Sequence, residues 1–236
     1  MSLKDEKEAS LQWSMNTFNL LQDVILAALT CPSYKVKCLQ DGDKDSISRI
    51  LDQSGNDYLI YNPSNPSDSF HIDWKCIAAG INKKTGLPYQ EGCKDFTIRA
   101  LRIDHGIYKS EFFNISRAIK TGRGIIPAFK VECNLTHDKT DLSWIGIVKT
   151  TTLYSYLDTI PGIQHIKECE DANCNQCRQS RTKGLRSGIF PKSYLQRNNG
   201  TFLAIPWEEL KELDGFICSY DVRTNELIHN KISKSA

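Results

Sequence analysis

Residues 56–75 read NDYLIYNPSNPSDSFHIDWK, and the predicted fold is built outward from this segment. DYLIYN is rich in the β-branched and aromatic residues that favour strands. FHIDWKCIAAGI has the same character. Between them, PSNPSDS contains the proline, asparagine and serine residues that are typical of turns. The segment therefore predicts a β-hairpin.

Two carboxylates and one lysine occupy defined positions in this hairpin. Asp57 and Asp73 are 73 − 57 = 16 positions apart, so strand pairing across the turn brings both carboxylates to the same end. Asp73 and Lys75 share a strand face, whereas Ile72 and Trp74 point the other way, into the sheet. Such oxygen ligands suit Mg²⁺, and a neighbouring lysine can stabilise a phosphate oxygen. The pattern favours half of a metal-dependent phosphodiesterase site; the alternative is a polar surface hairpin.

The hairpin resembles the PD-(D/E)xK nuclease superfamily, and within it the EcoRV-like DxK kind of type II restriction endonuclease. The resemblance covers about residues 56–77. It implies that Asp57 and Asp73 bind Mg²⁺, that the backbone carbonyl of Trp74 is a further ligand, and that Lys75 is the catalytic lysine. It also implies an Mg²⁺-dependent endonuclease that cuts a specific sequence in double-stranded DNA as a homodimer.

The chain departs from the family pattern at one position and leaves another undecided. Asn56 stands where the family has the proline that names it. Many such nucleases draw a further acidic residue from an N-terminal helix, and Glu6, Glu8 and Asp23 are the candidates here. A repair or defence nuclease on the same core is the alternative to a restriction enzyme.

The rest of the chain predicts further helices and strands. An apolar stripe with helical spacing runs over residues 6–30. The other predicted elements are strands at 95–103 and 125–137, an amphipathic helix at 110–122, an undecided segment at 143–157, a strand that leads into a helix at 201–213, and a closing hairpin at 215–232. We expect an α/β or α+β fold with a mixed central sheet flanked by helices, for which the resemblance implies a restriction-endonuclease-like core.

The expected organisation is a single nuclease domain over residues 1–236, with a Cys-rich and basic subdomain or insertion at 160–200. With 40% hydrophobic residues, the chain can bury one sizeable core. The N-terminal stretch MSLKDEKEAS is charged and lacks the apolar region of a secretory signal. We therefore expect a cytoplasmic protein with no membrane partner, whose nine cysteines are not a disulfide framework.

The Cys-rich segment HIKECEDANCNQC contains four residues that can bind zinc: His165, Cys169, Cys174 and Cys177. The last two form a C-x2-C knuckle, a common way of binding Zn²⁺ with two thiolates. Four such ligands would make a closed structural site. The alternative is a cluster of reduced cysteines without a metal.

A basic region follows this cluster. Six cations, with no acidic residue among them, are Arg178, Arg181, Lys183, Arg186, Lys192 and Arg197. Such a region favours contact with DNA phosphates, as does the loop at 82–94, and the alternative is a solvated loop. A second basic set around residues 99–123 is partly neutralised by acids. A non-catalytic, zinc-stabilised nucleic-acid-binding protein is the rival interpretation of the whole chain.

Two other features bear on the site. His71 lies on the same strand face as Asp73 and Lys75, where it either lines the site or is a surface histidine. Lys130 and Glu132 alternate on the strand predicted at 125–137. Glu132 is either an alternative acidic site residue or one partner of a strand-edge ion pair.

Overall fold

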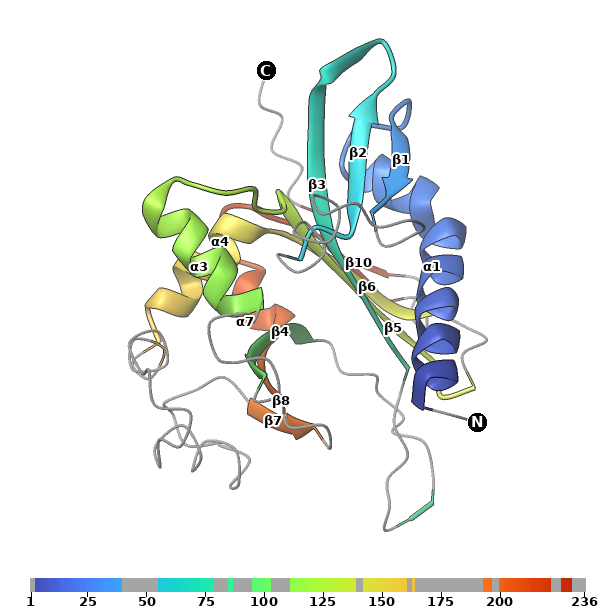
Figure 1. The fold of residues 1–236 in the computed structure, drawn as a ribbon, viewed down its shortest axis with the longest axis vertical. Helices are drawn as coiled ribbons and strands as arrows, with labels where there is room; N and C mark the ends of the chain where they lie inside the picture. Colours follow the sequence, from blue (N-terminus) through green and yellow to red (C-terminus); the bar gives the residue numbers. More distant parts are fainter. Residues whose placement is uncertain are drawn as a thin grey trace.

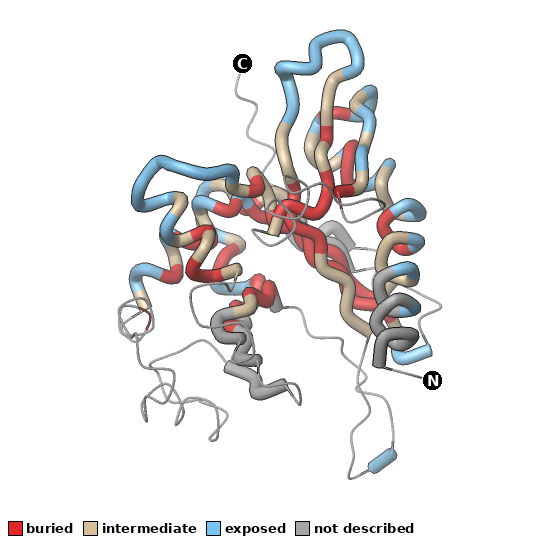
Figure 2. The backbone as a smooth tube through the Cα atoms, in the orientation of Figure 1, coloured by how far each residue is buried: buried red, intermediate tan, exposed pale blue. Residues whose placement is uncertain are grey.

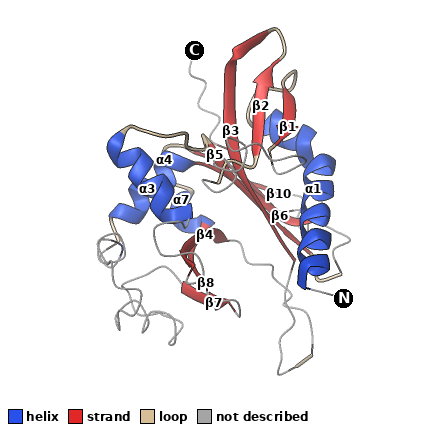
Figure 3. Ribbon diagram, viewed as in Figure 1, coloured by secondary structure: helices blue, strands red, loops and turns tan. Residues whose placement is uncertain are grey.

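The chain forms a mixed α/β structure in which two β-sheets are accompanied by helices (Figures 1 and 3). This computed structural model describes residues 3–39, 55–78, 85–86, 95–102, 111–138, 142–160, 163, 193–196, 200–221 and 226–230. The predicted combination of a mixed sheet with flanking helices is confirmed.

Most of the described strands belong to one large sheet. They are β1 (Lys35–Cys38), β2 (Tyr58–Asn62), β3 (Asn65–Ala78), β5 (Phe129–Leu135), β6 (Leu142–Lys149), β9 (Phe216–Asp221) and β10 (Glu226–Asn230). Their order across the sheet is β1-β2-β3-β5-β6-β9-β10. A second, smaller sheet has the order β4-β8-β7 and consists of β4 (Asp95–Arg102), β7 (Ser193–Gln196) and β8 (Gly200–Pro206).

The helices lie on both sides of the large sheet (Figure 1). They are α1 (Leu3–Ala28), α3 (Glu111–Thr121), α4 (Thr150–Asp158) and α7 (Trp207–Leu210). α1 covers one face, whereas α3, α4, α7 and the small sheet lie against the other (Figure 1). Within the described part of the chain, no helix is long and apolar enough to cross a membrane.

The pairing of β3 with β5 is parallel, whereas β2 pairs with β3, and β5 with β6, in antiparallel fashion. A parallel connection must return the chain to the end of the sheet from which it came. The chain between β3 and β5 therefore crosses over the sheet, and this crossover contains β4 and α3. The crossover brings both of these elements above the charged face of the hairpin.

The hairpin forms, but its turn is shorter than predicted. Strand pairing resumes at Asn65, opposite Asn62, so only Pro63 and Ser64 separate β2 from β3. The prediction of a turn over all of residues 63–69 is therefore wrong. The polar sequence can continue a strand because the whole tip is exposed and its side chains remain in water (Figure 2). The strand pairing is irregular beside Asn62.

Two apolar clusters lie on opposite faces of the large sheet. Beneath α1, Phe18 stacks on Tyr58 with ring centroids 3.8 Å apart and meets Trp74 edge-on at 5.1 Å. The other cluster joins α3, α4 and the small sheet to β6, and Phe96 meets Trp144 there at 5.5 Å. The most buried part of the chain is the set of strands that lies between these two clusters (Figure 2).

Candidate active site

The parallel pairing of β3 with β5 sets the register of four charged side chains. Asp73 lies opposite Lys130, and Lys75 lies opposite Glu132. The residues between them, such as Trp74, belong to the apolar cluster beneath α1. Because side chains alternate along a strand, the charged residues share the opposite face. Each strand therefore contributes one acid and one lysine to the same place.

Asp57 joins this site from the start of the hairpin. Its backbone N–H donates to the carbonyl of Ile72 over 3.0 Å, which continues the β2–β3 pairing one residue beyond β2. Its Oδ2 atom accepts the backbone N–H of Trp74 over 2.8 Å. Burial raises the pKa of Asp73 above its ordinary value, and the nearby charge of Asp57 adds to this effect. The two carboxylates of the hairpin therefore lie close together.

Lys130 lies between two carboxylates. Its ammonium group forms an ion pair with Asp73 and a second ion pair with Glu111 Oε1 over 3.1 Å. Burial by itself lowers the pKa of Lys130, but the charges of Asp73 and Glu111 outweigh burial and raise it. The ammonium form of Lys130 is thus held in place by its partners.

Glu111, in the first turn of α3, is fixed by several contacts. Its Oε2 atom accepts the backbone N–H of Arg99 on β4 over 3.3 Å, and its carboxyl group also lies within hydrogen-bonding reach of Asp73. Burial raises its pKa, but the positive charges of Lys130 and Lys75 outweigh burial and lower it. Asp73 and Glu111 are therefore two adjacent carboxyl groups that share one ammonium group.

Glu132 and Lys75 connect the site to β4. Both carboxylate oxygens of Glu132 accept hydrogen bonds from Thr97, one from its N–H and one from Oγ1, each over 2.7 Å. The ammonium group of Lys75 donates to the Thr97 carbonyl over 3.5 Å. Burial lowers the pKa of Lys75 and raises that of Glu132. Glu132 and Lys130 are buried on an interior strand, so the expectation of a strand-edge ion pair is wrong.

Two neighbours complete the surroundings of Asp73 and Glu111. Gly55 has φ +76°, and a Cβ atom added there would lie 3.4 Å from Glu111 Cγ and 3.7 Å from Asp73 Cγ. The hydroxyl of Tyr154, on α4, is buried and has no hydrogen-bond partner among the described residues. Burial raises the pKa of Tyr154, and the charges of Glu111 and Asp73 raise it further. The ring of Tyr154 stacks on that of Phe112, the residue that follows Glu111, with centroids 5.9 Å apart.

No protein-family model, curated protein or solved structure matches this chain. The chemistry of the site is therefore inferred from its own residues. Among the described residues, no group of three or more His, Cys, Asp and Glu side chains is arranged to hold a metal. Mg²⁺, however, is usually bound in proteins through one or two carboxylates and keeps several waters.

Asp57 and Asp73 supply such a pair of carboxylates for Mg²⁺. The carbonyl of Trp74 is the third oxygen in question. The N–H and carbonyl of one residue point to the same side of a strand, and the N–H of Trp74 reaches Asp57. The Trp74 carbonyl therefore faces the side of β3 on which Asp57 lies. These residues fit a hydrated Mg²⁺ ion.

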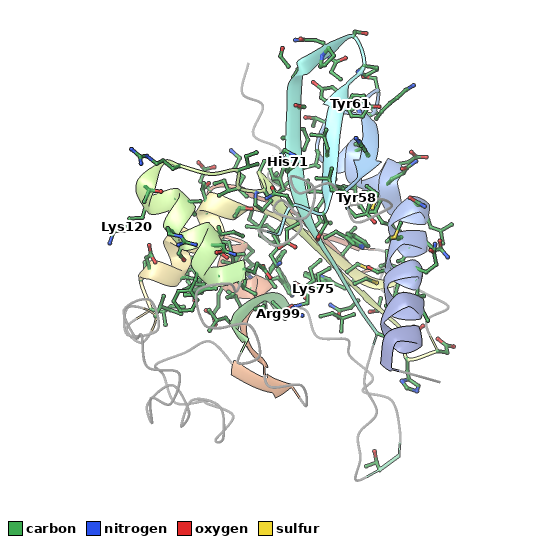
Figure 4. The ribbon with its side chains drawn as sticks, in the orientation of Figure 1. Tyr58, Tyr61, His71, Lys75, Arg99 and Lys120 are labelled. Carbon is green, nitrogen blue, oxygen red and sulfur yellow. The ribbon has the colours of Figure 1, made fainter. Side chains whose placement is uncertain are left out.

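Of the three acids considered on the N-terminal helix, Asp23 does not belong to the site. Asp23 is exposed on α1, which covers the opposite face of the sheet. Glu6 and Glu8 belong to α1, but their side chains lie outside the described residues. His71 is half-buried, and burial lowers its pKa. Figure 4 shows Lys75 near the centre of the molecule and His71 farther along the hairpin.

The predicted zinc ligands and basic residues cannot be placed. His165, Cys169, Cys174 and Cys177 lie outside the described residues, as do all six cations from Arg178 to Arg197. Most of the loop at 82–94 lies outside them as well.

Sequence reasoning missed the role of Glu111. An acidic residue in the first turn of a helix is usually explained by the helix dipole, so its sequence position carried no sign of a site. The alternation of Lys130 with Glu132 along one strand is a signal in the sequence. The sequence does not show, however, that this strand lies beside the hairpin. The structure places both sets of residues in one site.

Proposed function

We propose that this chain is a metal-dependent endonuclease that hydrolyses phosphodiester bonds in double-stranded DNA. The observation that carries the proposal is the convergence of Asp57, Asp73 and Lys75, from one hairpin, at one place, since Asp57 accepts the N–H of Trp74, which lies between the other two on β3. A restriction-endonuclease-like core is part of the proposal. The mixed central sheet, with helices on both of its faces, supports it.

Each residue has a distinct role in this chemistry. Asp57, Asp73 and the carbonyl of Trp74 would hold Mg²⁺, and a bound Mg²⁺ ion would supply positive charge to the scissile phosphate and a coordinated water. Lys75 stabilises negative charge on a phosphate oxygen as it develops. Glu132 acts indirectly, because its hydrogen bonds with Thr97 hold β4 over Lys75.

The substrate and assembly belong to the same proposal. The resemblance of the hairpin to type II restriction endonucleases suggests sequence-specific cleavage by a homodimer, because a two-fold dimer matches a palindromic site. Among the described residues, Arg117, Lys120 and Arg123 form an exposed basic group at the end of α3 and just beyond it. Such a group suits contact with DNA phosphates. The basic region after residue 178 extends this expectation.

The test is a cleavage assay on long duplex DNA, with and without base modification, in Mg²⁺ or EDTA. The variants Asp57→Asn and Lys75→Met remove one charge each. Asp73→Ala is a poor choice, because it removes one partner of the buried Lys130 ion pair and threatens folding. We expect the wild type to produce discrete fragments in Mg²⁺ alone, and both variants to lose cleavage by about 100-fold or more.

Matched controls use the same changes at exposed positions. Asp23→Asn and Lys149→Met alter exposed side chains on α1 and at the end of β6. Both should cut as the wild type does. Cleavage that survives in both site variants would move the catalytic centre elsewhere. Intact DNA in every lane, with salt-sensitive binding retained, would instead favour the non-catalytic binding protein.

A further inference from the structure

Acidic side chains outnumber lysines among the described residues of the site. Four acids, Asp57, Asp73, Glu111 and Glu132, and two lysines, Lys75 and Lys130, lie on one side of the large sheet. Fully ionised, these six groups carry two more negative than positive charges. Carboxylates gathered in this way are suitable ligands for a divalent cation.

The cation that the site already holds is the ammonium group of Lys130. It contacts the carboxylates of Asp73 and Glu111 at once, and its side chain is only 2% exposed. A position shared by two carboxylates is also one that a divalent cation can take, since oxygen ligands of this kind suit Mg²⁺ and Mn²⁺. The ammonium group and a metal ion would therefore compete for the same oxygens.

An independent observation points to a ligand at this position. Tyr154 is 3% exposed, its ring stacks on that of Phe112, the residue that follows Glu111, and its hydroxyl has no hydrogen-bond partner among the described residues. A buried hydroxyl without a partner is costly, and ordered water usually satisfies such a group. A water molecule of a hydrated cation bound by the two carboxylates would supply the missing partner. Gly55, whose backbone lies against both carboxyl groups, leaves the approach free of a side chain.

We propose that the Lys130 ammonium is an internal stand-in for a divalent cation, that the cation displaces it from Asp73 and Glu111, and that Glu111 is thereby a metal ligand. This inference deepens the proposed function and rests on it for the identity of the cation as the metal of the reaction. Lys130 keeps the carboxylates paired when no metal is bound. Because Lys130 competes for the same oxygens, it lowers the affinity of the site for the metal.

The test compares Lys130→Met with the wild type in the full-length protein. Binding of Mn²⁺ and of Mg²⁺ is measured by calorimetry, and the melting temperature is measured in EDTA and in Mn²⁺ at constant ionic strength. Removing the competing charge should tighten Mn²⁺ binding by about tenfold or more. In EDTA, Lys130→Met should have a lower melting temperature than the wild type. Mn²⁺ should raise the melting temperature of Lys130→Met more than that of the wild type, since a ligand that binds only the folded state stabilises it.

Two further variants separate the contributions. Lys149→Met removes an exposed lysine and should bind Mn²⁺ as the wild type does. Adding Glu111→Gln to Lys130→Met should abolish the gain in affinity. If Lys130→Met folds only when Mn²⁺ is present, that result also supports the displacement of Lys130 by the cation.

Other results would overturn the proposal. Mn²⁺ binding by Lys130→Met that is no tighter than that of the wild type would show that Lys130 positions Asp73 and does not compete. Failure of Lys130→Met to fold even with Mn²⁺ would show that a cation cannot replace the ammonium group. Because these measurements use no DNA, their outcome is separate from the cleavage assay, and either proposal can fail while the other stands.

Discussion

Asp57 contributes to the fold as well as to the chemistry that we propose for the site. Its charge lies beside Asp73, whereas its Oδ2 atom accepts the backbone N–H of Trp74 at the point where β2 has ended. The side chain thus takes the place of the strand partner that Trp74 would otherwise lack. A carboxylate that accepts a backbone hydrogen bond is held rigidly, which suits the metal-binding role that we propose for Asp57.

The two roles of Asp57 predict different effects for two substitutions. Asp57→Ala leaves the buried N–H of Trp74 without its acceptor and should lower the free energy of unfolding by about 2 kcal/mol. Asp57→Asn can still accept this hydrogen bond through its amide oxygen, so it should lose much less stability while losing the charge. Urea denaturation of both variants measures the difference. Equal losses would show that charge, and not the hydrogen bond, stabilises this end of the hairpin.

The residues of the site were predictable to different degrees. Asp57, Asp73 and Lys75 lie on one hairpin, whose pairing follows from local turn and strand signals. The place of Lys130 depends on the parallel register between β3 and β5, and strand periodicity does not reveal which strands are neighbours. Glu111 reaches the site only because the crossover carries the start of α3 over β3, which is a property of the tertiary fold.

At the level of elements, the sequence predicted the existence of strands better than their limits or partners. Tip residues 65–69 form part of β3 despite their turn propensity, and Asn65 and Ser69 pair there with Asn62 and Tyr61. The undecided segment at 143–157 contains both types of structure, with β6 changing to α4 at Thr150. β4 formed as predicted, but it joins the small sheet and not the large one.

Gly55, just before β2, makes the clearest prediction for an element. Its φ of +76° lies in the left-handed region that side chains with a Cβ atom rarely adopt, and the added atom would lie 3.4 Å from Glu111 Cγ. Gly55→Ala should therefore lower the free energy of unfolding by about 1–2 kcal/mol. Chemical denaturation provides the measurement. Gly86→Ala is a matched control for backbone strain, because Gly86 has φ +69° and no atom of the described residues lies within 4 Å of the added Cβ.

If the space around Gly55 matters as well as its backbone, Gly55→Ala will lose more stability than Gly86→Ala. It will also bind Mn²⁺ more weakly, because the methyl group lies against Glu111 and Asp73. An equal loss of stability in both variants, with unchanged Mn²⁺ binding, would show that Gly55 matters only for its backbone conformation.

For the molecule as a whole, the buried acid Glu132 joins the two sheets. It lies on β5 of the large sheet, and both of its hydrogen bonds reach Thr97 on β4 of the small one. Packing of Phe96 against Trp144 supports the same contact from the apolar side. The small sheet is therefore attached at a charged point and an apolar point, and the charged point also positions the carbonyl that Lys75 contacts.

Glu132→Gln should loosen the small sheet selectively. The amide can accept only one of the two hydrogen bonds and brings a donor where Thr97 already donates, so about 2 kcal/mol of local stability should be lost. Hydrogen exchange followed by mass spectrometry should show faster exchange in β4, whereas β2 should keep its protection. Thr97→Val, which loses only the hydroxyl bond, should have a smaller effect. Equal acceleration in β2 and β4 would mean that the two sheets unfold as one unit, so that Glu132 stabilises the whole protein and not this junction.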